Sequence, residues 1–170
     1  GEVVLEVTGI IDSETIKAKV LNNGTIKYMK TFNNGQFVND ESYINKCRQL
    51  ITGCDEFQPD YIAISYVNEA LNNRLKTELG LNGKKYKTII KMERDIADID
   101  LEKICQDPTY AMILIDRGEM GVNMPFEKIG LVQKSTIRNA KIHKKPVLVS
   151  TQILDSTVNN YIPNRADILN

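Results

Sequence analysis

Hydrophobic and polar positions alternate along the first part of the chain. Residues 2–32 contain three short β-rich runs, VVLEV, TIKAKV and TIKYMKTF. Turn-forming residues near Asp12 and around Gly24 separate these runs. A period of two broken by short turns is typical of neighbouring antiparallel strands. The pattern therefore predicts an antiparallel β-meander.

From about residue 41 the pattern changes, and helical segments precede short apolar runs. The helical segments are ESYINKCRQLI, NEALNNRLKTEL, DLEKIC and FEKIGLVQKSTIRNAKI, and the runs are YIAISYV, KTIIKME, AMILID and PVLVST. Such alternation indicates parallel strands joined by right-handed crossovers. We expect an α/β fold, either an open doubly wound sheet or a section of a barrel, with an internal boundary between residues 33 and 40.

Each apolar run ends in polar residues that could form a ligand site. In parallel α/β folds, ligands gather at the carboxyl ends of the strands. The residues at these ends are Ser65; Lys91 and Glu93; Asp116, Arg117, Gly118 and Glu119; and Ser150 and Thr151. Lys91 and Glu93 are two positions apart, so they project to the same side of a strand and could serve one ligand.

Each of these signals also has a purely structural interpretation. Lys91 and Glu93 could form an ordinary ion pair. Gly118 and Gly121 could shape a strand-to-helix turn, or they could let backbone amides approach an anion beside Glu119. Thr151 could cap a helix instead of touching a ligand.

Composition limits the size, partners and compartment of the protein. The 170 residues are 42% hydrophobic and 26% charged, which suits one core but is short for a complete α/β barrel. Basic and acidic residues number 22 each, so the net charge of zero gives no reason to expect nucleic acid or membrane binding. Three cysteines without paired spacing and the lack of a secretory signal predict reduced thiols in the cytoplasm.

Several ordered segments resemble one known family, the pyruvate kinases. They match its lid-domain end, its strand ending in serine, its lysine and glutamate strand, its glycine turn and a long later stretch. The segments are AKVLNNGTIKYMKTFN (18–33), residues 60–67, residues 89–93, residues 117–121 and residues 125–167. Together they cover most of residues 15–170.

The resemblance implies a fold and an activity. Residues 1–36 would be the C-terminal part of the β-rich lid domain, and residues 37–170 a partial TIM (β/α)8 barrel. The activity would be phosphoryl transfer from phosphoenolpyruvate to ADP, giving pyruvate and ATP in the last step of glycolysis. The alternative is a catalytically weak paralogue that assembles with or regulates an active pyruvate kinase subunit. Either protein would be cytoplasmic and form a homo- or hetero-oligomer.

The resemblance also assigns roles to individual residues. Glu93 and Glu119 would hold Mg²⁺ (or Mn²⁺), and Lys91 would stabilise charge on the phosphoryl group in transfer. Thr151 would lie beside the enolate carbon that becomes protonated. Gly118 and Glu119, through their backbone amides, would bind substrate together with Ser65 and Thr151. The K⁺ that the family uses would have its ligands outside this chain segment.

Some positions depart from the family pattern. Glu119 stands where the family has aspartate, and Asp116 replaces an alanine, which adds a carboxylate near the site. Asn68 and Ile162 replace arginines, and Arg94 replaces an asparagine. A small insertion around residues 106–109 should fall in a loop. The family's other barrel strands and its regulatory domain are not represented, so we expect this chain to be part of a longer one.

Overall fold

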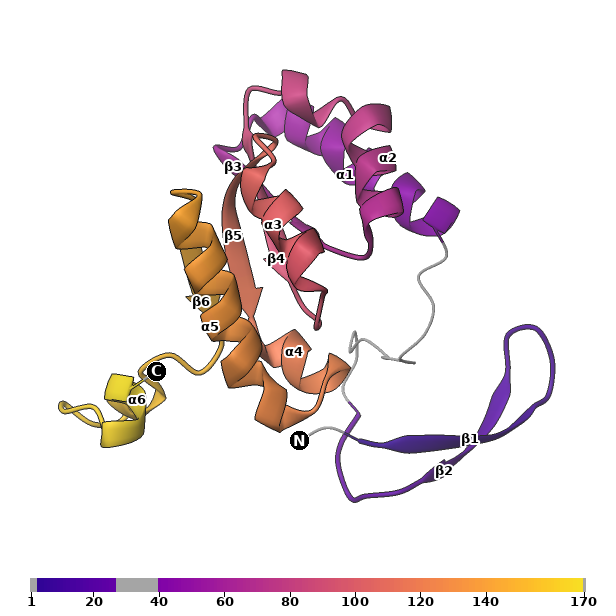
Figure 1. Cartoon of the computed structure of the whole chain (residues 1–170). Helices are drawn as coiled ribbons and strands as arrows, with labels where there is room; N and C mark the ends of the chain where they lie inside the picture. The colour runs from indigo at the N-terminus through magenta and orange to yellow at the C-terminus, as the bar shows by residue number, and fades with distance from the viewer. Residues whose placement is uncertain (1–2, 27–39, 170) are drawn as a thin grey trace. The chain divides into compact units, whose positions relative to one another are not determined.

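The first of two compact units contains a β-hairpin. The computed structural model describes residues 3–26 and 40–169, and the chain divides into Gly1–Asn34 and Gly35–Asn170. In the first unit, β1 (Leu5–Ile10) pairs antiparallel with β2 (Ile16–Val20) (Figure 1). The Ile11 amide donates to the Thr15 carbonyl oxygen across 2.9 Å and closes the turn. Two strands of the predicted meander are confirmed, and the third run lies largely outside the described residues.

The second unit is built on a parallel sheet of four strands. These are β3 (Tyr61–Ser65), β4 (Lys87–Met92), β5 (Tyr110–Asp116) and β6 (Val147–Ser150), in that order across the sheet. Each strand lies beside the next one in the sequence, as in a barrel. A doubly wound sheet instead reverses its order at a switch point. The order therefore favours the barrel section of the two predicted arrangements.

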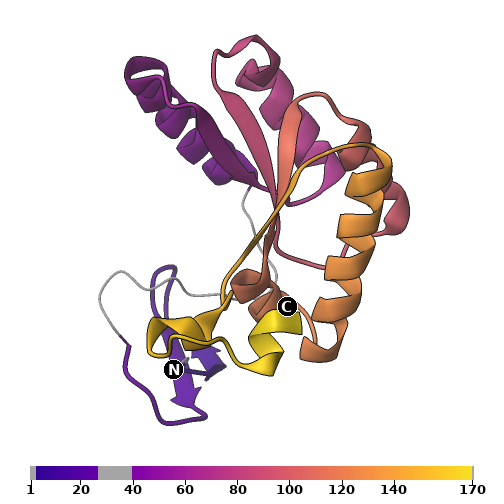
Figure 2. The ribbon, with the colours of Figure 1, turned by 90° about the vertical axis from the view of Figure 1, so that its left-hand side faces the viewer.

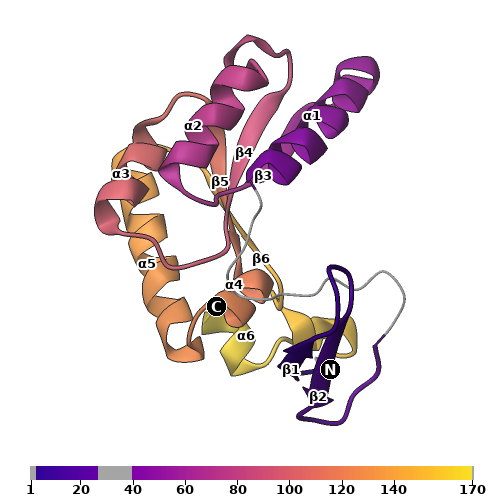
Figure 3. The same ribbon diagram turned by 90° about the vertical axis from the view of Figure 1, so that its right-hand side faces the viewer.

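Helices connect the strands and cover the sheet. Their bounds are α1 (Asp40–Phe57), α2 (Glu69–Glu78), η1 (Leu81–Gly83), α3 (Asp98–Gln106), α4 (Arg117–Asn123), α5 (Phe126–Ile142), η2 (Asp155–Val158) and α6 (Arg165–Leu169). Helices α3 and α5 lie side by side along the sheet (Figures 2 and 3). Of the predicted insertion at residues 106–109, Gln106 is the last residue of α3 and residues 107–109 form the connection from α3 to β5.

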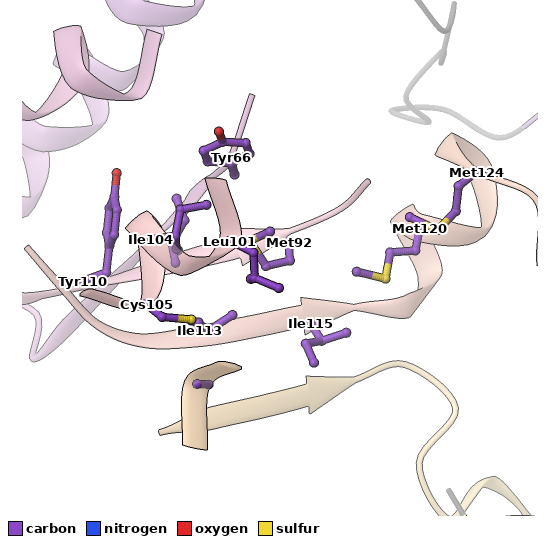
Figure 4. Close-up of a cluster of buried hydrophobic side chains, with 12 residues drawn as sticks. Tyr66, Met92, Leu101, Ile104, Cys105, Tyr110, Ile113, Ile115, Met120 and Met124 are labelled. Carbon is purple, nitrogen blue, oxygen red and sulfur yellow. The ribbon is translucent and has the colours of Figure 1, made fainter. Parts of the chain in front are cut away.

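One core cluster lies between the sheet and helices α3, α4 and α5. Ile113 and Ile115 of β5 are fully buried and belong to the same cluster as Leu101 of α3 and Met120 of α4 (Figure 4). A second cluster gathers residues of α1, α2 and the first two strands: Ile44, Ile51, Ile64, Leu71, Leu75, Leu79, Leu81 and Tyr86. Burying one such side chain contributes about 1.5–3 kcal/mol.

Among the described residues, no helix combines the length and apolar character that crossing a membrane needs.

The alternation along β4 separates this core from the polar residues. Ile90 and Met92 are completely buried, whereas Lys91 between them is only half-buried. Because side chains alternate between the two faces of a strand, Lys91 and Glu93 lie on the face away from this core. Asp116 shares that face, since it alternates with the buried Ile115 on β5.

Candidate active site at the strand ends

The polar residues predicted at the strand ends do meet along one edge of the sheet. Ser65 pairs in register with Lys91 of the neighbouring strand, and Asp116 pairs with Ser150. Thr151 directly follows β6. The parallel register thus places these residues at the same end of four adjacent strands.

The Glu93 side chain contacts both Lys91 and Ser65. Its Oε1 lies 2.5 Å from Lys91 Nζ and accepts a hydrogen bond from Ser65 Oγ at 3.0 Å. The side chains of Lys91 and Glu93 are 24% and 13% exposed. The Glu93 carbonyl oxygen also accepts a hydrogen bond from Asn123 Nδ2 at 3.0 Å, which ties the strand end to α4. The pair is thus an ion pair, but a partly buried one that belongs to a larger network.

Asp116 extends this network across the sheet. Its Oδ2 lies 3.2 Å from Lys91 Nζ. Its Oδ1 accepts hydrogen bonds from Thr151 Oγ1 and from the Glu119 amide, both at 3.4 Å. The contact with the amide makes Asp116 the N-cap of α4. One carboxylate therefore connects residues from the ends of β4, β5 and β6. From the sequence, Asp116 was expected only to add a carboxylate near the site. Its position at the end of a strand was the sequence feature that could have predicted these contacts.

The two carboxylates keep Lys91 protonated. Partial burial disfavours the charged ammonium, but hydrogen bonds and charge interactions with Glu93 and then Asp116 outweigh burial, so the pKa of Lys91 is raised. An ammonium group has three N–H donors, and these carboxylates occupy two of them. No other described residue pairs with this ammonium, so one N–H remains for a ligand.

Thr151 has a strained backbone that its neighbours hold in place. Its φ of 74° lies in the left-handed region, which a β-branched residue rarely adopts. Arg117 Nη2 donates to the carbonyl oxygens of Thr151 at 2.6 Å and of Gln152 at 2.8 Å. The next helical segment, η2, begins after Leu154, so the helix-cap interpretation of Thr151 is wrong. Such strain persists only where the surroundings enforce it, and it concentrates at functional sites.

Gly118 is required for close approach to Thr151. A Cβ atom on Gly118 would lie 3.1 Å from Thr151 Oγ1 and 3.2 Å from its Cγ2. The glycine is not in a turn, because α4 begins directly after Asp116. Residues 116, 117 and 118 therefore all contact or closely approach Thr151, and the expected glycine turn is corrected to a short helix.

The other changed positions are spread around this edge. Glu119 is exposed, and its carboxylate makes no hydrogen bond or ion pair with any residue that the structure describes. Asn68 is the N-cap of α2 and accepts a hydrogen bond from the Leu71 amide at 2.8 Å. Arg94 has a buried Nε for which the described part of the chain offers no hydrogen-bond partner.

Comparison with known proteins identifies the family. The family model described as pyruvate kinase, barrel domain, matches residues 1–170. The chain belongs to the pyruvate kinase family. This membership was predicted from the sequence motifs and is confirmed, together with the partial TIM barrel fold.

Relatives match nearly all of the chain. The pyruvate kinase of Thermotoga maritima is 33% identical over 170 residues, which cover 99% of this chain and 36% of the relative. That of Mycobacterium intracellulare is 31% identical over 169 residues, covering 98% and 35%. The structure of Cryptosporidium parvum pyruvate kinase in complex with ADP matches with a TM-score of 0.74 and 26% identity, covering 99% of this chain and 35% of that one. The chain spans about a third of the length of these pyruvate kinases.

The donor chemistry of the site suits the divalent ion that this family implies. Magnesium binds through one or two carboxylates together with substrate oxygens, and it does not need a cage of protein ligands. Within residues 3–26 and 40–169, no group of three or more histidine, cysteine, aspartate or glutamate side chains is arranged to hold a metal. Glu93 and Glu119 are carboxylate donors of the required kind, so the residues fit magnesium by chemistry.

Proposed function

We propose that this chain is the catalytic part of a pyruvate kinase that transfers a phosphoryl group from phosphoenolpyruvate to ADP, giving pyruvate and ATP. Residues 37–170 would form part of the barrel and residues 1–36 the end of the lid. The observation that carries the proposal is the partly buried Lys91 ammonium at the same sheet edge as Glu93 and Thr151, with one N–H that no described residue occupies. That the Cryptosporidium relative is in complex with ADP supports a nucleotide substrate.

Lys91 would act on the phosphoryl group. Phosphoryl transfer spreads negative charge over the equatorial oxygens, so catalysis depends on positioning and on charge neutralisation. The raised pKa keeps Lys91 positive at neutral pH, and its remaining N–H can donate to one of these oxygens. Glu93 fixes the direction of the ammonium through its 2.5 Å contact.

Glu93 and Glu119 would hold the magnesium ion. The bound ion would supply charge neutralisation for the phosphoryl oxygens. Glu119 is exposed and carries no competing partner among the described residues, which leaves its carboxylate available. The potassium ligands would lie in parts of the protein outside this chain.

Thr151 and the start of α4 would position the rest of the substrate. The Thr151 hydroxyl would lie beside the carbon that becomes protonated, and the Gly118 and Glu119 amides would face the substrate carboxylate. Ser65 would contribute through its bond to Glu93. A cytoplasmic location and assembly with further pyruvate kinase subunits belong to the same proposal.

A coupled lactate dehydrogenase assay on the full-length protein tests this function. Lys91→Met should abolish pyruvate formation even in the protein that remains folded, and the melting temperature shows whether the variant is folded under the assay conditions. Lys87→Met is the matched control, because Lys87 begins the same strand but lies 5.7 Å from the Tyr61 ring at the other end. Equal activity in Lys91→Met and the wild type would refute the role of Lys91.

A catalytically weak subunit that assembles with an active pyruvate kinase is the second candidate. The Asp116 carboxylate favours it, because this negative charge partly neutralises the ammonium that the reaction needs. Glu119 also favours this candidate. Its side chain is one methylene longer than aspartate, and magnesium tolerates little change in ligand geometry. No activity alone, together with changed activity when the protein is mixed with an active paralogue, would support this candidate over the first.

A further inference from the structure

Asp116 makes more contacts with the proposed catalytic groups than any role as a helix cap requires. A cap needs only the bond from the Glu119 amide. The same carboxylate also contacts Lys91 Nζ with one oxygen and the Thr151 hydroxyl with the other. These two groups come from strands on either side of β5, and Asp116 lies between them.

We propose that Asp116 is a positioning residue that holds the Lys91 ammonium and the Thr151 hydroxyl in one fixed arrangement facing a shared substrate. The inference rests on the proposed function, which gives Lys91 and Thr151 their roles. It goes beyond that function by assigning a role to Asp116, a residue that departs from the family pattern. Asp116 acts through the other two residues and needs no contact with substrate.

The surroundings of Asp116 suit this role. Its side chain is 17% exposed, so water competes less for its hydrogen bonds than at an open surface. The Thr151 hydroxyl has one hydrogen and two lone pairs. Because the hydrogen is donated to Asp116, both lone pairs point away from Asp116. The Thr151 backbone is held independently by Arg117. The consecutive residues Asp116 and Arg117 therefore fix the side chain and the main chain of Thr151, respectively.

Charge also constrains what Asp116 can do. Its carboxylate would repel an anionic substrate, so it cannot strengthen substrate binding directly. Removing it should therefore not raise KM for phosphoenolpyruvate. Any benefit must appear in kcat, through better alignment of Lys91 and Thr151. Misplacement of catalytic groups by about 1 Å can cost about a hundredfold in rate.

The test measures kcat and KM separately in the full-length protein. Asp116→Ala should lower kcat by about tenfold to a hundredfold while KM stays constant or falls. Asp116→Asn keeps an acceptor for Thr151 and for the Glu119 amide, so its kcat should lie between those of Asp116→Ala and the wild type. Asp95→Asn is the control for charge, because Asp95 is exposed and contacts Lys128 at 3.6 Å, outside this network.

A double-mutant cycle separates positioning from folding. If Asp116 acts partly through Thr151, Asp116→Ala should lower kcat much less in a Thr151→Val background than in the wild type. A merely structural role would lower the melting temperature and the active fraction but leave the kcat of the folded fraction unchanged. Wild-type kcat in Asp116→Ala, or independent effects of the two substitutions, would overturn this inference alone. A wild-type protein without turnover would overturn the proposed function and this inference together.

Discussion

Arg117 Nη2 donates to the carbonyl oxygen of Thr151 across 2.6 Å, although 34 residues separate them in the chain. Arg117 Nε approaches the same oxygen at 3.1 Å, and Nη2 reaches the carbonyl oxygen of Gln152. Thr151 and Gln152 both have positive φ, so the guanidinium holds a strained segment of main chain. The link joins the first residue of α4 to the loop after β6.

Replacing Arg117 by methionine should loosen that loop. Hydrogen bonds to charged groups contribute about 1.5–3 kcal/mol, so we expect a loss of stability in the lower part of that range. The kcat of the full-length protein should fall with it, because Thr151 loses its support. Urea unfolding and the coupled assay measure the two effects. Arg138→Met on the exposed face of α5 is the control and should change neither.

Gly118→Ala tests the close packing against Thr151. The new methyl group would lie 3.1–3.2 Å from two Thr151 atoms, so Thr151 must move and kcat should fall by about tenfold or more. Gly130→Ala in α5 is a matched control, because nothing lies within 4 Å of its Cβ position. That control should raise stability by about 0.5–1 kcal/mol through helix propensity alone. Equal kcat values in the two variants would contradict the packing argument.

Glu119→Gln tests the proposed metal site. Glutamine keeps the length of the side chain but removes the charge that binds magnesium, so half-maximal activity should require a markedly higher magnesium concentration. Titration of activity with magnesium in the full-length protein measures the change. Glu127→Gln in the first turn of α5 serves as the comparison. An unchanged titration would eliminate Glu119 as a metal ligand.

Asp107→Asn should change the pH dependence of stability. Burial of Asp107 acts against its charged form, but hydrogen bonds from Lys76 and Thr109 outweigh burial and hold its pKa below the ordinary 3.8. The charged carboxylate therefore stabilises the folded state fully above about pH 4, and this contribution disappears as the pH falls through the lowered pKa. The stability difference between wild type and variant should be constant near neutrality and shrink below pH 4. Glu102→Gln in α3, the helix that Asp107 caps, serves as the comparison.

Ile113→Ala tests the core between the sheet and the helices. Ile113 is completely buried, so the substitution should cost about 2–5 kcal/mol by leaving a cavity. Leu131→Ala on α5 is the control, since Leu131 is 69% exposed and should cost well under 1 kcal/mol. Chemical unfolding of the two variants measures the contrast.

The sequence predicted the elements with regular periodicity and missed short helical segments such as α4. The segment FEKIGLVQKSTIRNAKI was predicted as a helix and forms α5 over the same residues. Helix α4 was predicted as a turn, because Gly118 and Gly121 both lower helix propensity. The N-cap Asp116 and the burial of Met120 in the core stabilise this helix despite its low intrinsic helix propensity.

The candidate site was predictable as a set of residues but not as a network. Strand ends and side-chain alternation located Ser65, Lys91 and Glu93 on one edge, since these follow from period and register. Contacts between residues far apart in the chain, such as those of Asp116 and Arg117 with Thr151, do not follow from any local pattern. The strained φ of Thr151 likewise depends on its tertiary neighbours.

The alternation along β4 makes this strand intolerant of any change in length. Deleting one residue before Lys91 would shift every later side chain to the opposite face of the sheet. Lys91 would then point among the apolar side chains that now surround Ile90 and Met92, and two large apolar groups would take its place at the open edge. Insertions and deletions in this half of the chain should therefore be confined to connections such as residues 107–109, while β4 itself admits only substitutions.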